Sequence, residues 1–264
     1  MAGKLKTLVM TATYNEIENL PQLVDEIWRC EQDVDILVID DNSPDGTGEW
    51  CDRRRAEDPR LHCIHRPGKL GLGTATIAGL RYAMEKGYDV VINMDADFSH
   101  PPERLSALRA KIEAAEVPPV DVAIGSRYVA GGRIEGWPPL RHLMSRGVNL
   151  YAKIFLGLPM RDCSGAFRAY RTSILRRLDF STIRSRGYSF QEEILWRLNR
   201  LGARFAETPI TFVDRARGKS KINGKESLLA LWIIVILGLE GLFRPRRDAG
   251  VDLSEAGPPP DSPS

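Results

Sequence analysis

The chain has 264 residues, 43% of them hydrophobic and 27% charged, which is typical of a globular protein long enough to bury a core. Its net charge of +2 does not indicate a nucleic-acid partner, because neither sign of charge is in large excess. Its four cysteines show no Cys-x-x-Cys spacing, which argues against a zinc site or a disulfide framework. A strand pattern begins close to the N-terminus, so we expect no signal peptide and a cytoplasmic protein.

The first 126 residues alternate between strand and helix patterns. Short apolar runs, typical of buried parallel strands, predict strands at 7–13, 35–39, 61–65, 90–94 and 120–126. Helical periodicity and capping signals predict helices between them, at 20–28, 46–57, 74–86 and from 101 onward. This alternation predicts an α/β fold with a Rossmann-like, mostly parallel sheet flanked by helices. Ligands bind such a sheet at the carboxyl ends of its strands.

The pattern becomes less regular after residue 127. Glycines and prolines at 131–132 and 137–139 predict a loop. Beyond it we expect two more helices and two short strands, at about 141–156, 192–201, 167–170 and 210–213. No linker separates this half from the first, so residues 1–225 are expected to form one domain.

Residues 228–239 are the most apolar segment of the chain. A helix needs roughly 20 apolar residues to cross a bilayer, and Glu240 ends this run well before that length. Two interpretations stay open: a buried terminal helix that docks on the domain, or an interfacial helix whose following arginines lie near lipid headgroups. We assign 226–247 to a membrane-associated helix and 248–264, rich in Pro, Ser and Asp, to a disordered tail.

Asp95-Ala96-Asp97 follows directly on the strand expected at 90–94. A turn can aim both carboxylates at one cation, and their hard oxygens suit Mg²⁺ or Mn²⁺. Short acidic pairs are also common in turns, so the motif alone is weak evidence for a metal. Ser99 and His100 just beyond it are either further ligands or turn residues.

Other strand ends also carry polar groups. Asp40 and Asp41 close the second expected strand, where carboxylates could accept hydrogen bonds from a base or a ribose. The Asn-Ser-Pro-Asp-Gly that follows is also a turn sequence in its own right. Tyr14 could stack on a base, with Glu16 beside it, and Lys69 suits a phosphate. Neither a Walker loop nor a Gly-x-Gly-x-x-Gly after the first strand is present, which argues against a dinucleotide-dependent oxidoreductase.

Together these segments resemble family 2 glycosyltransferases with the GT-A fold, and among them the polyprenol- or dolichyl-phosphate mannose synthases. The resemblance covers roughly residues 7 to 225 in the family's order. Its matching segments are Thr-Tyr-Asn-Glu at 13–16, Asp-Asp-Asn-Ser-Pro-Asp-Gly-Thr at 40–47, Gly-Leu-Gly-Thr at 71–74, Met-Asp-Ala-Asp-Phe-Ser-His-Pro-Pro at 94–102, Gly-Ser-Arg-Tyr-Val at 125–129, Ser-Gly-Ala-Phe-Arg at 164–168, Gly-Tyr-Ser-Phe-Gln-Glu-Glu at 187–193 and Gly-Lys-Ser-Lys at 218–221.

The resemblance implies which residues form the site. Asp95 and Asp97 would bind the metal. The nucleotide sugar would contact Ala12, Tyr14, Glu16, Asp40, Asp41, Lys69, Asp95, Ala96, Asp97 and Glu193. Glu193 is our choice among the acids of the Gln-Glu-Glu run, one of which would lie near the sugar hydroxyls. The acceptor phosphate would be held by Arg127, Arg141, Arg215 and Lys221. Asp97, Arg127 and Arg141 would act in catalysis.

The implied reaction transfers mannose from GDP-mannose to polyprenyl or dolichyl phosphate and inverts the anomeric carbon to give a β-linked product. An ionised phosphate acceptor is already a nucleophile, so no general base is required. The motifs do not separate GDP-mannose from UDP-glucose or another UDP-hexose, and a non-catalytic nucleotide-sugar-binding protein is a further alternative. Implied partners are the lipid acceptor, the cytoplasmic face of a membrane, and a small membrane protein or a second copy of the chain.

Two features depart from the family's pattern. Ala12 stands where the family usually has proline before Thr-Tyr-Asn-Glu, which should loosen the strand end slightly without removing a ligand. Some relatives carry transmembrane helices, whereas this chain has only the short apolar run at 228–239. It is therefore similar to members that act from the membrane surface.

Overall fold

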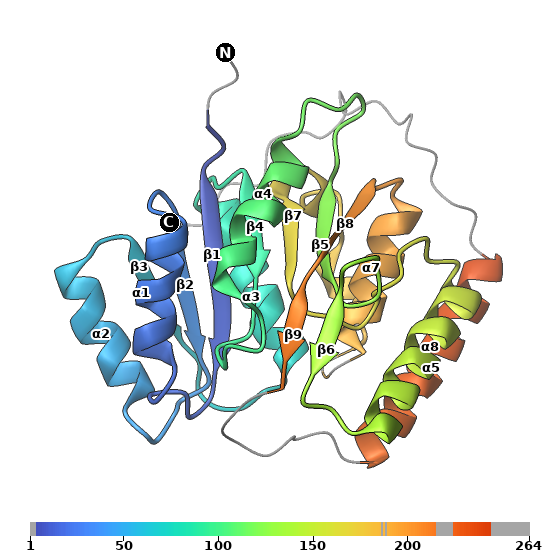
Figure 1. The fold of residues 1–264 in the computed structure, drawn as a ribbon, viewed down its shortest axis with the longest axis horizontal. Helices are drawn as coiled ribbons and strands as arrows, with labels where there is room; N and C mark the ends of the chain where they lie inside the picture. Colours follow the sequence, from blue (N-terminus) through green and yellow to red (C-terminus); the bar gives the residue numbers. More distant parts are fainter. Residues whose placement is uncertain (1–3, 186, 188, 215–223, 244–264) are drawn as a thin grey trace, which may run out of the picture.

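The computed structural model describes residues 4–185, 187, 189–214 and 224–243, in which helices cover both faces of a central sheet (Figure 1). In this part of the chain the main sheet has seven strands in the order β3-β2-β1-β4-β7-β5-β8. β7 pairs antiparallel with β4 and β5, and the other pairings are parallel, which confirms the mostly parallel sheet. The strands are β1 (Thr7–Thr13), β2 (Asp35–Asp40), β3 (Leu61–His65), β4 (Val90–Asn93), β5 (Val122–Ser126), β7 (Arg168–Arg171) and β8 (Phe205–Pro209).

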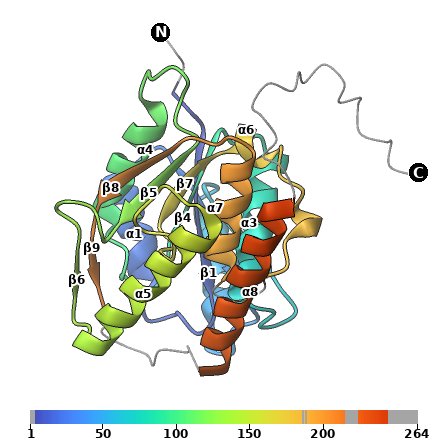
Figure 2. The ribbon, with the colours of Figure 1, turned by 90° about the vertical axis from the view of Figure 1, so that its right-hand side faces the viewer.

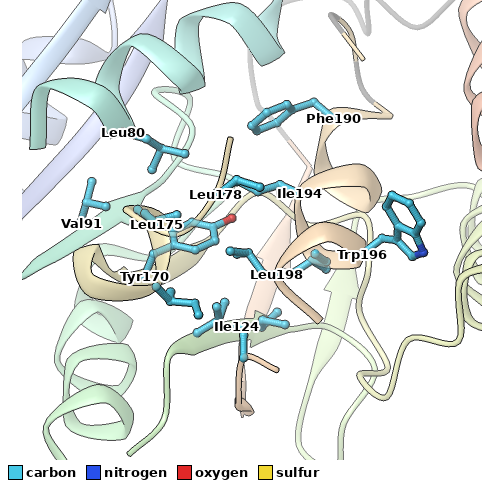
Figure 3. Packing of buried hydrophobic residues seen from close by; sticks show 14 of the residues in the cluster. Leu80, Val91, Ile124, Tyr170, Leu175, Leu178, Phe190, Ile194, Trp196 and Leu198 are labelled. Carbon is cyan, nitrogen blue, oxygen red and sulfur yellow. The ribbon is translucent and has the colours of Figure 1, made fainter. Parts of the chain in front are cut away.

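Two clusters of buried apolar side chains lie on opposite faces of the sheet. One includes the apolar stripes of α1 and α4, and the other includes those of α3, α6 and α7 together with buried residues of α5 and α8. Figure 3 shows the second cluster, in which Ile194 and Leu198 of α7 lie toward Tyr170 and Ile124 of the sheet, and Phe190 lies on the side of Leu80 of α3. The helices are α1 (Leu20–Cys30), α2 (Thr47–Glu57), α3 (Leu72–Glu85), η1 (Pro102–Arg104), α4 (Leu105–Glu113), α5 (Pro139–Leu156), α6 (Thr172–Leu175), η2 (Phe180–Thr182), α7 (Phe190–Arg200) and α8 (Gly224–Phe243).

The local sequence explains why α3 sits close to α7. A Cβ atom on Gly73 would lie 2.9 Å from the Cβ of Phe190, closer than packed side chains approach. A glycine at this position therefore lets the start of α3 pack directly on the start of α7. The contact places the start of α3 against Phe190, the residue before the Gln191-Glu192-Glu193 run.

The second half contains the strand expected at 210–213 and two strands that the sequence did not predict. Arg133–Glu135, within the expected loop, forms β6 and pairs in parallel with β9 (Thr211–Val213). β8 pairs with β5 at the edge of the main sheet. These strands are short and partly exposed, so they lack the long apolar runs that revealed β1 to β5.

α8 and α5 lie side by side at one edge of the molecule (Figures 1 and 2). Ile234 and Leu237 of α8 are buried, whereas Trp232 and Leu239 are 62% and 52% exposed. α8 therefore has features of both interpretations of the apolar run: one side is docked on the domain, and other apolar side chains are exposed. Within the described ranges, no helix is both long and apolar enough to cross a membrane. The tail expected at 248–264 and the end of the 226–247 segment lie outside the described residues.

Candidate active site

The expected site residues gather where parallel strands end. In the strand register, Thr13 of β1 pairs with Asp40 of β2, so Tyr14 and Asp41 leave the sheet at the same level. On the other side of β1, Met10 pairs with Asn93, the last residue of β4, and Asp95 follows two residues later. This edge corresponds to the ligand-binding edge of a doubly wound sheet.

A left-handed residue follows each of three site side chains. Asn15, Asn42 and Phe98 have φ values of 61°, 58° and 60°, and they come directly after Tyr14, Asp41 and Asp97. Asparagine tolerates this region, but it is strained for phenylalanine. Backbone strain of this kind persists where surrounding structure holds a functional turn. The strain at Phe98 marks the Asp95-Ala96-Asp97 turn as a site held in a specific shape.

The two adjacent acids at the end of β2 have different surroundings. Asp40 accepts hydrogen bonds from Thr13 Oγ1 at 3.0 Å, Ser43 N at 3.0 Å and Ser43 Oγ at 2.5 Å. These contacts hold the turn after β2. Asp41 is instead 2.9 Å from Arg66 Nη1, and burial raises the pKa of Asp41 although Arg66 opposes the shift. Asp40 thus shapes the loop, and Asp41 is the better placed of the two for a ligand.

Arg66 was not among the expected site residues. It follows β3 directly, and its Nη2 donates to Thr74 Oγ1 at 2.6 Å in the first turn of α3. Arg66 is buried, so its charge is directed at Asp41 and the start of α3 rather than at solvent. The sequence feature that could have identified Arg66 is its position, because it is a cation at the carboxyl end of a predicted strand.

The remaining donor-side residues lie around the ends of β1 and β3. Lys69 Nζ is 5.1 Å from the centroid of the Tyr14 ring, a cation–π distance. Glu16 Oε2 accepts from Asn19 Nδ2 at 3.0 Å, which orients the carboxylate at the start of α1. Ala12 lies in β1 beside Ile39 of β2. The structure therefore brings the 12–16, 40–41 and 66–69 segments together.

The Asp-x-Asp turn is braced by the residues that follow it. Asp97 Oδ1 accepts from Ser99 N at 3.1 Å and Ser99 Oγ at 2.6 Å. Asp95 N donates to His100 Nδ1 at 3.0 Å, and the imidazole stacks on Phe167 with ring centroids 5.2 Å apart. Burial lowers the pKa of His100, although Asp95 and Asp97 oppose the shift, so a neutral imidazole accepts this bond. Ser99 and His100 therefore position the two carboxylates.

The donor set of this turn fits a divalent cation shared with a diphosphate. Ala96 is buried in the core, and the Asp95 side chain is 36% exposed, so the turn is anchored but open to a ligand. Among the described residues, no group of three His, Cys, Asp or Glu side chains is arranged to hold a metal by itself. Mg²⁺ commonly takes only one or two protein carboxylates and completes its shell with water and substrate phosphate. Asp95 and Asp97 match that pattern.

Arg127 forms a buried ion pair beyond the fifth strand. Its Nε and Nη2 each donate to Asp162 at 2.7 Å, and Nη2 also donates to Ser164 Oγ at 2.8 Å. Burial alone would raise the pKa of Asp162, but Arg127 holds it below its usual value. The guanidinium carbon lies 5.7 Å from the Trp137 ring centroid. A guanidinium fixed in this way can present a charge to a ligand with little loss of entropy.

Arg141 approaches the same indole from the first turn of α5. Its guanidinium carbon is 4.1 Å from the Trp137 centroid, and its Nη1 donates to both carboxylate oxygens of Asp214, at 3.0 and 2.9 Å. The structure thus brings the two expected acceptor arginines, Arg127 and Arg141, to one aromatic side chain. Arg215 and Lys221 lie outside the described residues.

The family model of glycosyl transferase family 2 matches residues 8–179. The chain belongs to this family. An undecaprenyl-phosphate mannosyltransferase of Micrococcus luteus is 47% identical over 83% of this chain and 88% of its own. A polyprenol monophosphomannose synthase of Mycolicibacterium smegmatis is 42% identical over 89% of this chain and 88% of its own. Among solved structures, glucosyl-3-phosphoglycerate synthase of Mycobacterium tuberculosis with Mn²⁺ and UDP has a TM-score of 0.60 at 19% identity, covering 89% of this chain and 78% of its own. This last likeness supports the GT-A fold.

Within the described residues, Glu193 of this glycosyltransferase has a structural role: it binds other parts of its own chain. Its carboxylate is fully buried and accepts from Arg184 N, Ser185 N and Arg197 Nε at 2.8 to 3.1 Å. These bonds clamp the segment before α7 onto the first turn of that helix. Because both oxygens are used within the protein, the geometry does not favour Glu193 as a ligand of the donor sugar.

Glu192 is the acid of this run that the geometry favours. It is buried near Arg168, Asp162 and Arg127, and its burial raises the pKa of its carboxyl to about 7. No described residue lies within hydrogen-bonding distance of its Oε2, nor of the side-chain amide of the adjacent Gln191. Buried polar atoms without partners are costly, and they are common where a ligand supplies the missing bond. The motif alone does not distinguish Glu192 from Glu193 as the ligand.

Proposed function

We propose that this glycosyltransferase transfers mannose from GDP-mannose to a polyprenyl phosphate, with inversion at the anomeric carbon. Two relatives that are 47% and 42% identical over most of the chain bear the names of enzymes that make mannosyl lipid phosphates. The observation that carries the proposal is the division of the site into two charged regions. The acidic Asp95–Asp97 turn suits a metal-bound diphosphate, and the paired arginines at Trp137 suit a second phosphate.

On the donor side, Asp41 accepts hydrogen bonds from N–H groups of the base, and Tyr14 stacks on it. Arg66 favours the ionised form of Asp41 across their 2.9 Å contact, which keeps the carboxylate an acceptor. Lys69, beside Tyr14, is proposed to contact a phosphate of the nucleotide.

Asp95 and Asp97 are proposed to hold Mg²⁺ or Mn²⁺. When bound, the cation neutralises charge on the departing diphosphate. Ser99 fixes the Asp97 carboxylate, and His100 fixes the backbone at Asp95, so the two ligands are oriented before substrate arrives. Glu192 is proposed to bond to a hydroxyl of the transferred sugar, which would satisfy its buried oxygen.

On the acceptor side, Arg127 and Arg141 hold the lipid phosphate, with Arg215 and Lys221 proposed as further cations. Their charge and fork geometry match phosphate oxygens. A phosphate monoester is ionised near neutral pH, so its oxygen attacks without a general base. In-line attack from the side opposite the diphosphate inverts the anomeric carbon and gives a β-linked product.

We further propose that residues 1–225 form the catalytic domain, and that the enzyme acts peripherally at the cytoplasmic face of a membrane, where its acceptor lies. A small membrane partner or self-association is compatible with this arrangement.

The test is a direct comparison of donors. Purified enzyme is incubated with polyprenyl phosphate, Mg²⁺ and either GDP-mannose or UDP-glucose, and the glycolipid formed is quantified. We expect turnover with GDP-mannose at least about tenfold faster, the scale of losing one or two base hydrogen bonds. Equal or faster turnover with UDP-glucose would assign the enzyme to UDP-hexoses instead.

A further inference from the structure

α5 exposes an unusual number of large apolar side chains. Its exposed positions, here called the α5 stripe, are each between 47% and 68% exposed: Leu140, Leu143, Met144, Leu150, Ile154 and Phe155. Single exposed leucines are normal on a protein surface, but a contiguous apolar patch marks an interaction site. The stripe extends over the whole length of the helix.

The α5 stripe lies on the outer face of the helix. At 3.6 residues per turn its six positions fall on one side. The buried residues of α5, Asn149, Ala152 and Leu156, fall on the opposite side. α5 is therefore apolar on the surface that points away from the protein, and the core does not account for that composition.

The charges on α5 are all of one sign. Residues 139–156 contain Arg141, Arg146 and Lys153 and no aspartate or glutamate. Arg146 is exposed and Lys153 partly exposed, and both fall along one flank of the α5 stripe. An apolar face bordered by cations is the pattern of a helix that lies in the interface of an anionic membrane.

α8 extends this surface. A Cβ on Gly238 would lie 2.9 Å from the backbone oxygen of Phe155, so the two helices are in close contact. The exposed Trp232 and Leu239 of α8 add apolar area, and tryptophan is enriched at membrane–water interfaces. Figure 2 shows both helices on the side of the molecule that faces the viewer.

α5 also connects this surface to the acceptor arginines. Ser145 accepts from Tyr128 Oη at 2.7 Å, next to Arg127 in the chain. Asn149 donates to Ser164 Oγ at 3.1 Å, and Ser164 in turn accepts from Arg127. A helix seated on a bilayer would thus hold the phosphate-binding side chains at a fixed depth near the lipid headgroups.

We propose that the α5 stripe, extended by Trp232 and Leu239, docks on the surface of an anionic phospholipid bilayer. The inference deepens the proposed function and rests on it, because an acceptor with a lipid tail requires the enzyme to work at a membrane. It moves the main contact from the 226–247 segment, where the sequence placed it, to α5. The cationic flank favours a lipid surface over a second copy of the chain, since two such faces would bring like charges together.

The experiment is vesicle flotation with the full chain. Neutral phosphatidylcholine vesicles are compared with vesicles that also contain phosphatidylglycerol. The test variant is Leu143→Glu with Ile154→Glu, both at exposed positions, and the matched control is Val117→Glu, which is 95% exposed in the loop between α4 and β5. Thermal unfolding of each variant verifies that it folds. A charge-reversed variant, Arg146→Glu with Lys153→Glu, tests the cationic flank.

We expect the natural chain and the Val117→Glu control to float with the anionic vesicles. The α5 double variant should lose about a hundredfold or more in partitioning, the scale of removing two leucine-sized side chains from an apolar phase. The charge-reversed variant should lose its preference for anionic vesicles. The α5 double variant should also turn over long-chain acceptor in vesicles slowly but a short, water-soluble polyprenyl phosphate at the normal rate.

Equal flotation of the natural chain and the α5 double variant would overturn the proposal. The proposal would also be overturned if the natural chain did not float with protein-free vesicles. In that case, either a membrane protein is needed for binding, or sedimentation would show a dimer that the α5 double variant abolishes. If flotation depends on α5 but no acceptor is glycosylated, the proposed function fails and the docking surface stands.

Discussion

Replacing Glu192 by glutamine should stabilise the empty protein at alkaline pH and change its stability less at acidic pH. The carboxyl is buried, and its burial raises its pKa from the usual 4.5 to about 7. The folded protein therefore keeps this proton up to about pH 7, whereas the unfolded chain releases it near 4.5. The free energy of unfolding falls as the pH rises between these two values, because the folded state binds more protons there.

The size of the effect follows from the shift. One pKa unit corresponds to about 1.4 kcal/mol, so the stability lost across the whole window is about 3 kcal/mol as an order of magnitude. Glutamine does not titrate and has nearly the same shape. The stability difference between the variant and the natural chain should therefore widen by about 2 to 3 kcal/mol from about pH 5 to about pH 8.

The assay is urea unfolding, followed by tryptophan fluorescence, at several pH values in that range. Glu193→Gln is the matched control at the neighbouring position. It weakens the bonds to Arg184, Ser185 and Arg197, so it should destabilise the protein throughout the range without a gain at alkaline pH. Parallel stability curves for Glu192→Gln and the natural chain would show that Glu192 is not the buried acid described here.

Other substitutions test the ion pair at Arg127, the base site, the packing of α3 on α7 and the metal. Asp162→Asn removes the buried partner of Arg127 and should cost about 3 to 5 kcal/mol in urea unfolding; an unchanged midpoint would contradict the ion pair. Asp41→Asn should weaken GDP binding by about tenfold or more in calorimetry, and unchanged affinity would remove Asp41 from the base site. Gly73→Ala places a methyl group against Phe190 and should cost about 1 to 3 kcal/mol, measured by thermal unfolding; full stability would show that the helices can shift. Chelation by EDTA should abolish transfer until Mg²⁺ or Mn²⁺ is added back, and full activity in EDTA would contradict the metal assignment.

The first half of the fold could be predicted from the sequence because its strands are buried on both faces. β1 and β2 are almost entirely buried and rich in Leu, Val, Ile and Met, and the turns after them begin at Tyr14 and Asp41. Of the later strands, β9 was expected near 210–213, whereas β6 and β8 were not predicted. All three are short and partly exposed, and their pairing depends on partners far away in the chain. Periodicity carries little information on such pairing.

The sequence predicted which residues belong to the candidate site, but not which of them contact one another. Motif order identified the segments that carry Asp97, Arg127 and Glu192. It did not indicate that Glu193 is clamped within its own chain, because that depends on how residues 184–185 fold back onto α7. Nor did it reveal the exposed stripe of α5, since an amphipathic pattern does not state which of its faces meets the core.

In the proposed function, the Asp95–Asp97 turn supports transfer of mannose to a lipid phosphate. The most direct measurement is incorporation of radiolabel from GDP-mannose into solvent-extractable polyprenyl phosphate by the purified chain and by Asp97→Ala. We expect labelled lipid with the natural chain, and a loss of label by about two or more orders of magnitude with a variant that still folds. Transfer by Asp97→Ala at the natural rate, or no labelled lipid from the natural chain, would contradict it.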